Sequence, residues 1–155
     1  MNLSTHFTLD EATHSAKAIE LGISNQPNEQ QLENMKIAAE GMEKVRALLG
    51  KPIHINSWLR LPAVNVAVGG SAKSSHMDGW AIDFTCSGVG TPLEVAKMIE
   101  ESDIKFDQII HEYATWVHIS FAPELRMQKM TIMRPTNTHM YASGLLTHDE
   151  YKSLA

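Results

Sequence analysis

The chain has 155 residues, of which 43% are hydrophobic and 20% charged, and its formal net charge at pH 7 is -5. This length and composition predict one globular domain, residues 1–155, with the segment from about residue 123 to 155 as a C-terminal extension packed on it. The acidic balance argues against a nucleic-acid-binding protein, which would normally present a basic face, and no apolar run approaches the roughly 20 residues of a membrane helix.

The N-terminus has no basic segment followed by an apolar stretch. We therefore expect no signal peptide and accumulation in the cytoplasm. The single cysteine, Cys86, excludes an internal disulfide and a cysteine-based structural zinc site. Any metal must then be held by histidine and carboxylate side chains, and the chain has eight histidines.

Helices are predicted in the N-terminal third. Residues Thr8–Glu11 have the capping-box pattern of a short helix, which should end near Leu21-Gly22. A longer helix is expected over about residues 28–49, because apolar residues recur there at spacings of three and four. Gly50 is a stop signal for this helix.

The remainder mixes strands with short helices. Strands are expected over residues 53–57, 80–84, 106–113 and 115–121, the last two as a hairpin that lacks an Asn-Gly turn. Start signals predict helices near Pro62, at Thr91 and at Thr147, and residues 126–134 are expected as an edge strand or an extended arm. This order of elements predicts an α+β domain, with a small antiparallel sheet flanked by helices.

Three residues have the chemistry and placement of metal ligands. His76 and Asp83 are seven residues apart, with Gly79 between them to turn the backbone, and His118 lies in an apolar strand pattern. Two imidazoles and one carboxylate are the usual protein ligands of a catalytic zinc, whose fourth position is left for water. Each residue alone has a commoner role, as a hydrogen-bonded core histidine or a capping aspartate, so the prediction depends on the combination.

Three short runs match the motifs of a known family. The run Ser-x-His-x-x-Gly-x-Ala-x-Asp is present as Ser74, His76, Gly79, Ala81 and Asp83, and a Trp-x-His run is present as Trp116 and His118. Upstream, Ser57, Arg60, Pro62 and Asn65 keep the family spacing, although Trp58 and Leu59 replace its glycine and tyrosine. Over residues 4–122 the chain resembles the zinc peptidoglycan peptidases of the D-Ala-D-Ala carboxypeptidase and L-Ala-D-Glu endopeptidase group, which include many phage endolysins.

The resemblance implies the fold shared by these peptidases and the hedgehog domain. It also implies that His76, Asp83 and His118 bind Zn²⁺, which would polarise the scissile carbonyl and lower the pKa of a bound water. The implied partner is the peptide stem of peptidoglycan, cut at either the L-Ala-D-Glu or the D-Ala-D-Ala bond. We expect a monomer with no nucleic-acid or membrane partner. A small endolysin would need help, such as a holin, to reach the wall.

The general base does not follow directly from the motifs. In many relatives it is an acidic residue three positions before the last histidine, and here that position holds Thr115. Glu112, across the expected hairpin turn from His118, is the preferred substitute, ahead of Asp107. His111 and Glu112 begin a His-Glu-x-x-His string, but Thr115 occupies the second ligand position, which excludes that zinc motif.

Other residues are candidates for the substrate. Arg60 is expected to pair with a substrate carboxylate or to stabilise the developing oxyanion. Ser74 is expected to hydrogen-bond either a metal ligand or the substrate. Trp116 is expected to line a substrate groove, and Trp80 either lines it or packs in the core. His6, His14, His54, His139 and His148 match no motif and are expected on the surface or in the core. A non-catalytic module that binds the wall or belongs to a phage particle remains the alternative, because the usual acid before His118 is missing.

Overall fold

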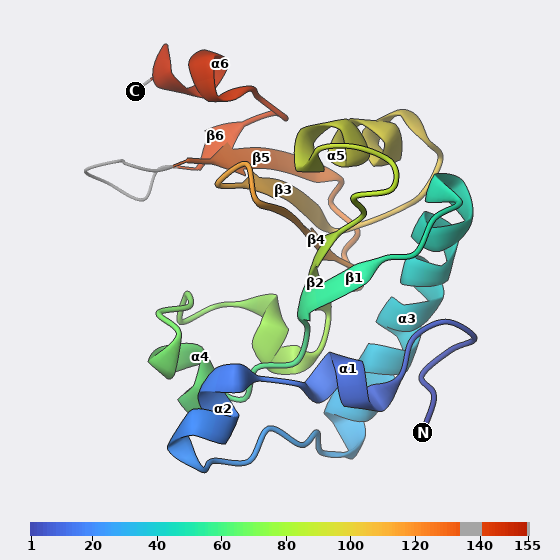
Figure 1. The fold of residues 1–155 in the computed structure, drawn as a ribbon, viewed down its shortest axis with the longest axis vertical. Helices are drawn as coiled ribbons and strands as arrows, with labels where there is room; N and C mark the ends of the chain where they lie inside the picture. Colours follow the sequence, from blue (N-terminus) through green and yellow to red (C-terminus); the bar gives the residue numbers. More distant parts are fainter. Residues whose placement is uncertain (134–140, 155) are drawn as a thin grey trace.

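The computed structural model describes residues 1–133 and 141–154. It confirms the α+β class, with helices packed on one open sheet (Figure 1). The helices are α1 (Leu9–Thr13), α2 (Ala16–Leu21), α3 (Glu29–Leu49), α4 (Pro62–Ala67), α5 (Pro92–Glu101) and α6 (His148–Lys152), with a 3-10 turn, η1, at Ser75–Asp78. The strands are β1 (His54–Ser57), β2 (Ala81–Thr85), β3 (Gln108–Glu112), β4 (Trp116–Ser120), β5 (Gln128–Ile132) and β6 (Ala142–Ser143).

The N-terminal helix predicted as one element is two helices in the structure. Helix α1 begins with the predicted capping box at Thr8 but ends at Thr13. Ser15 has extended backbone angles, and its side chain accepts a hydrogen bond from the backbone of Ala18, so it starts a new helix. That helix, α2, ends at Gly22 as predicted.

The long helix α3 matches its predicted range closely. Asn28 caps it, and Gly50 ends it in the left-handed conformation. Its buried stripe consists of Met35, Ala38, Ala39, Met42, Val45 and Leu49. Full burial of one large apolar side chain contributes about 1.5–3 kcal/mol, so this stripe anchors the core against the sheet.

The sheet has the strand order β1-β2-β4-β3-β5-β6, and its pairs are antiparallel except β3 with β5, which is parallel. The predicted antiparallel sheet is confirmed, and this one parallel pair is an addition to it. Asp107, just before β3, accepts three hydrogen bonds from the backbone and side chain of Arg126. This contact places β5 on the outer side of β3 and in the same direction.

Residues 128–132 form a strand, but not an edge strand as one alternative had it, because β6 pairs with its free side. Arg134, the predicted end of that element, lies outside the described residues. A small cluster of Met133, Ala142, Leu146 and Tyr151 packs α6 onto this part of the molecule. The capping box predicted at Thr147 is present at the start of α6.

The two faces of the sheet carry different side chains. One face packs in the core with α3 and α5 (Figure 1) through Ile82, Phe84, Ile109, Val117 and Ile119. The opposite face carries Asp83 on β2 and His118 on β4, which are direct cross-strand partners. Within the described residues, no helix combines the length and hydrophobicity that a membrane crossing requires.

Candidate metal centre

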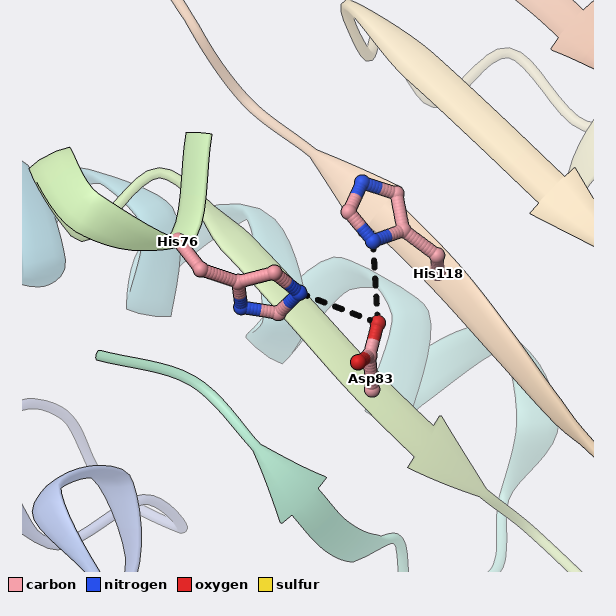
Figure 2. Close-up of side chains that lie close together, drawn as sticks. All are labelled: His76, Asp83 and His118. Atoms are coloured by element: carbon pink, nitrogen blue, oxygen red, sulfur yellow. Dashed lines mark hydrogen bonds and ion pairs between the residues drawn. The ribbon is translucent and has the colours of Figure 1, made fainter. Parts of the chain in front are cut away.

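The structure brings together the three residues that the motifs single out. His76 comes from η1, Asp83 from β2 and His118 from β4, and their side chains converge on one point (Figure 2). One ligand atom from each lies within 4.8 Å of the others, and all three residues are buried. The closest atoms are His76 Nε2, His118 Nδ1 and Asp83 Oδ1. These are two nitrogens and one oxygen, a donor set that suits Zn²⁺.

Local hydrogen bonds fix the turn that carries His76. The Ser74 hydroxyl accepts from the backbone N–H of His76 and caps η1. Gly79 ends η1 at φ +84, and its carbonyl accepts from the buried indole N–H of Trp58. A Cβ at Gly79 would lie 2.7 Å from Cγ of Met35, so only glycine fits both the backbone angle and the space.

The protonation of His76 leaves a lone pair facing a carboxylate. Its Nδ1 lies 2.6 Å from the backbone oxygen of Trp58, and since a carbonyl can only accept, Nδ1 carries the proton. Burial lowers the pKa of His76, which favours the neutral ring. Its buried Nε2 therefore has a lone pair, has no hydrogen-bond partner among the described residues, and lies 3.2 Å from Oδ1 of Asp83. A cation between these atoms would satisfy both.

Asp83 lies between the two imidazoles. Burial opposes its ionisation, but the electrostatic interactions with the two histidines and the hydrogen bond from His118 outweigh burial and hold the pKa of Asp83 below its usual range. Nδ1 of His118 lies 2.9 Å from the same Oδ1 atom. Two imidazole nitrogens and a charged carboxylate oxygen that converge within 4.8 Å are donors of the type that zinc binds, so the residues fit a zinc ion.

Glu112 lies beside this cluster. Its Oε1 atom accepts from the Trp116 indole N–H at 2.7 Å and is 3.8 Å from Nδ1 of His118. Burial raises the pKa of Glu112. The hairpin turn that joins β3 to β4 places it there, with Tyr113 and Ala114 both in the left-handed region at φ 56 and 55. Left-handed non-glycine residues cost on the order of 1 kcal/mol each and often occur at functional sites.

The two alternative positions for the base lie elsewhere. Thr115 is in the hairpin turn, where its hydroxyl donates to the backbone oxygen of Tyr113. Asp107 is at the opposite end of β3 from Glu112, and the hydrogen bonds from Arg126 lower its pKa. Asp107 is thus committed to a structural contact, whereas Glu112 adjoins the candidate ligands.

The cluster opens into a cleft of about 1220 Å³. Arg60, Ser74 and Trp116 all line it, as the motifs predict. A guanidinium nitrogen of Arg60 donates to the Ser74 hydroxyl at 3.4 Å, and the buried Nε of Arg60 has no hydrogen-bond partner among the described residues. Trp80 packs against the core, which is the second of its two expected roles.

Many cleft residues carry no motif signal, among them His14, His54, Met130 and Tyr141. His14 and His54 are exposed, which is one of the two expected placements, but the sequence could not place them at the site. Met130 is within the predicted 126–134 element, and its position follows from the pairing of β5 with β3. Of the remaining unassigned histidines, His6 pairs with Glu43, His148 begins α6, and His139 lies outside the described residues.

Comparison with known proteins gives one clear relationship. No curated protein matches the chain at a significant level. Residues 5–120, well over half of the chain, match the family described as Peptidase M15. The match includes all three candidate metal ligands and Glu112, and its range agrees with the resemblance seen over residues 4–122. The chain therefore belongs to the Peptidase M15 family, a family of zinc peptidases that act on peptidoglycan-type substrates.

Proposed function

We propose that this protein is a zinc metallopeptidase that hydrolyses the peptide stem of bacterial peptidoglycan, as a phage-type endolysin or a D-Ala-D-Ala carboxypeptidase-like enzyme does. The observation that carries this proposal is the buried Nε2 lone pair of His76, which faces the carboxylate of Asp83 without a hydrogen. Family membership makes zinc the metal of choice. The open cleft gives a peptide access to the cluster.

The ligands would be Nε2 of His76, Oδ1 of Asp83 and Nδ1 of His118. A zinc ion held there would supply Lewis acidity toward a substrate carbonyl and a water of lowered pKa. The Trp58 carbonyl holds the ring of His76 in the orientation and tautomer that ligation needs.

Glu112 acts as the general base. It takes a proton from the attacking water and then gives that proton to the leaving amine nitrogen, so that the amide C–N bond breaks. The Trp116 indole holds one carboxylate oxygen, which leaves the other free to accept the proton. Arg60, positioned by Ser74, donates to a carboxylate of the substrate or to the developing oxyanion.

A metal and activity analysis of matched variants tests this function. Wild-type protein should bind about one zinc ion per chain and digest purified peptidoglycan, and His76→Ala should lose both properties. His14→Ala is the control, because His14 lines the same cleft but is not a candidate ligand. Wild-type protein without zinc, or full digestion by the His76→Ala variant, would contradict the proposal.

The second candidate is a non-catalytic zinc-containing module that binds the wall or forms part of a phage particle. Thr115 favours it, because the usual acid is missing from that position. Catalysis has the stronger support, since three donors rather than four gather among the described residues and Glu112 lies next to them. Wall binding by zinc-loaded protein with no release of peptide products would favour the module.

A further inference from the structure

Arg126 lines the cleft at the opposite end of β3 from Glu112. Its side chain contacts Asp107, just before β3, whereas Ile110 of β3 is the direct cross-strand partner of His118. A strand rises about 3.3 Å per residue, so the separation of Asp107 from Ile110 places Arg126 roughly 10 Å from the candidate metal ligands. No motif and no step of the proposed reaction uses Arg126, and the family match ends before it, at residue 120.

A buried carboxylate holds the guanidinium of Arg126 in one orientation. Asp107 accepts from Nε and Nη2 of Arg126 at 2.9 Å each, and from its backbone N–H at 3.1 Å. The Asp107 side chain is 4% exposed, but the Arg126 side chain is 51% exposed, so the N–H groups that Asp107 does not use remain available to a ligand. Glu124 also attracts the guanidinium, but more weakly, and it is exposed. Because Asp107 fixes the orientation in advance, a ligand of Arg126 would cost less side-chain entropy on binding.

The backbone on both sides of Arg126 has an unusual conformation. Leu125 and Met127 both have positive φ, at 43 and 57. This region is unfavourable for residues other than glycine, and such residues cluster at functional sites. Met127 packs against the core while Arg126 lines the cleft, so the two neighbours lie on opposite sides of the chain. The backbone therefore directs Arg126 to the cleft at an energetic cost.

The cleft next to Arg126 is lined by Gln108 and Ile110 of β3 and by Met130 of β5. The amide nitrogen of Gln108 donates to Oε1 of Gln128 at 2.7 Å and to Sδ of Met130 at 3.6 Å, so both of its N–H groups are used. None of these three neighbours is charged, whereas Arg126 is a cation. An anionic group at this end of the cleft would therefore be bound by Arg126.

A fixed guanidinium suits a carboxylate, because the two groups can pair through parallel hydrogen bonds. We propose that Arg126 binds a carboxylate of the stem peptide that lies away from the cleaved bond, and makes the enzyme selective for stems in which this group is free. Arg60, which adjoins Ser74 and the metal cluster, acts at the cleaved bond instead. This inference rests on the proposed function and holds for either of the two bonds.

Peptidoglycan stems carry carboxylates at such a distance. Extended peptide advances about 3.3 Å per residue, so roughly 10 Å corresponds to about three residues, or to fewer residues and a long side chain. The D-Glu residue is linked through its side-chain carboxyl group, which leaves its α-carboxylate free. Diaminopimelate, as the third residue of a stem, has a second carboxylate where lysine has none. Both carboxylates share the chemistry that Arg126 recognises, and each can be removed separately.

The first test compares three stem peptides with zinc-loaded protein. One contains D-Glu and diaminopimelate, the second has the D-Glu α-carboxylate amidated, and the third has lysine in place of diaminopimelate. We expect kcat/KM to be about fivefold to twentyfold lower for the peptide that lacks the bound carboxylate, which identifies that group. Equal kcat/KM for all three would overturn the inference and leave the peptidase function intact. Absence of hydrolysis, of peptides and of purified peptidoglycan alike, would overturn the proposed function.

The second test assigns the selectivity to Arg126. In Arg126→Gln, kcat/KM should fall only for the peptide that carries the bound carboxylate, so the ratio between the matched peptides should approach one. A loss of folded protein would lower the rates for both peptides equally, and the ratio therefore separates recognition from stability. Lys129→Gln is the control, because Lys129 is a cation of β5 that pairs with Glu100 and does not line the cleft. A ratio in Arg126→Gln equal to that of the wild type would overturn the inference.

A binding measurement gives a readout that does not depend on turnover. In zinc-loaded Glu112→Gln protein, the Kd of the stem peptide with both carboxylates, measured by calorimetric titration, should rise about fivefold to twentyfold when Arg126→Gln is added. The Kd of the peptide that lacks the bound carboxylate should stay the same. An equal Kd for the first peptide in the single and double variants would refute the carboxylate site.

Discussion

Replacement of Glu112 by glutamine isolates its role in proton transfer. Glutamine keeps the volume of the side chain and an oxygen that can accept from the Trp116 indole, so the 2.7 Å hydrogen bond can persist. What is lost is the ability to take a proton from water next to His118. Loss of a general base lowers kcat about 10²–10⁴-fold, which corresponds to roughly 3–5 kcal/mol in the activation free energy. We expect zinc content and KM to change little.

The matched comparison is Asp107→Asn, which changes the other acidic candidate, just before β3. Asp107 accepts three hydrogen bonds from Arg126 and is almost fully buried, so its amide variant should lose about 1–3 kcal/mol of unfolding free energy. Its kcat should stay near that of the wild type. Steady-state hydrolysis of a stem peptide, together with the zinc content and urea unfolding of each variant, distinguishes a catalytic role from a structural one. A large drop of kcat in Asp107→Asn and none in Glu112→Gln would refute the assignment.

Three further predictions concern the framework of the site. Gly79→Ala should lower the free energy of unfolding by about 3 kcal/mol or more, because its Cβ would collide with Met35. Gly22→Ala, at a similar φ but with open space, should lower it by about 1 kcal/mol. Equal losses for the two variants in urea unfolding would contradict this. Arg126→Ala should destabilise the protein by about 1–2 kcal/mol near pH 7. Arg126 lowers the pKa of Asp107, so the stability difference between wild type and Arg126→Ala should be fully present above the ordinary aspartate pKa. The difference should vanish as pH falls through the lowered pKa of Asp107. A stability difference that persists at low pH in urea unfolding curves would refute this mechanism. Removal of zinc with a chelator should lower the Tm, and restored zinc should reverse the change; a Tm insensitive to zinc would exclude a folded-state metal site.

The convergence of the three candidate ligands could be predicted because it depends on local chemistry. The spacing from His76 to Asp83 contains one tight turn and one strand start, and both are short-range events that Gly79 makes recognisable. Alternation on the strand of His118 also predicts which residues share a face. The sequence does not predict the helix break at Ser15, for a different reason. Serine is a common N-cap residue, and Ser15 caps α2 by accepting from the backbone N–H of Ala18. The apolar pattern nevertheless continues across Ser15, which favours a single helix.

The extent of the cleft could not be predicted, because it depends on which strands pair. Met130 enters the site only because β5 returns parallel to β3, and Asp107 and Arg126 that fix this pairing are 19 positions apart. Tyr141 reaches the cleft through the same long-range arrangement. Sequence periodicity assigns a face to each residue but does not name the partner strand.

The direct cross-strand pairing of Asp83 and His118 also depends on the register between β2 and β4. If β4 slipped by one residue against β2, His118 would turn into the core and the apolar Val117 would face the cleft, since side chains alternate along a strand. Such a chain would have lost a candidate zinc ligand and buried an imidazole at the same time. A zinc ion held by these residues would therefore favour the correct strand register, because only the correctly aligned sheet could bind it and gain its binding free energy.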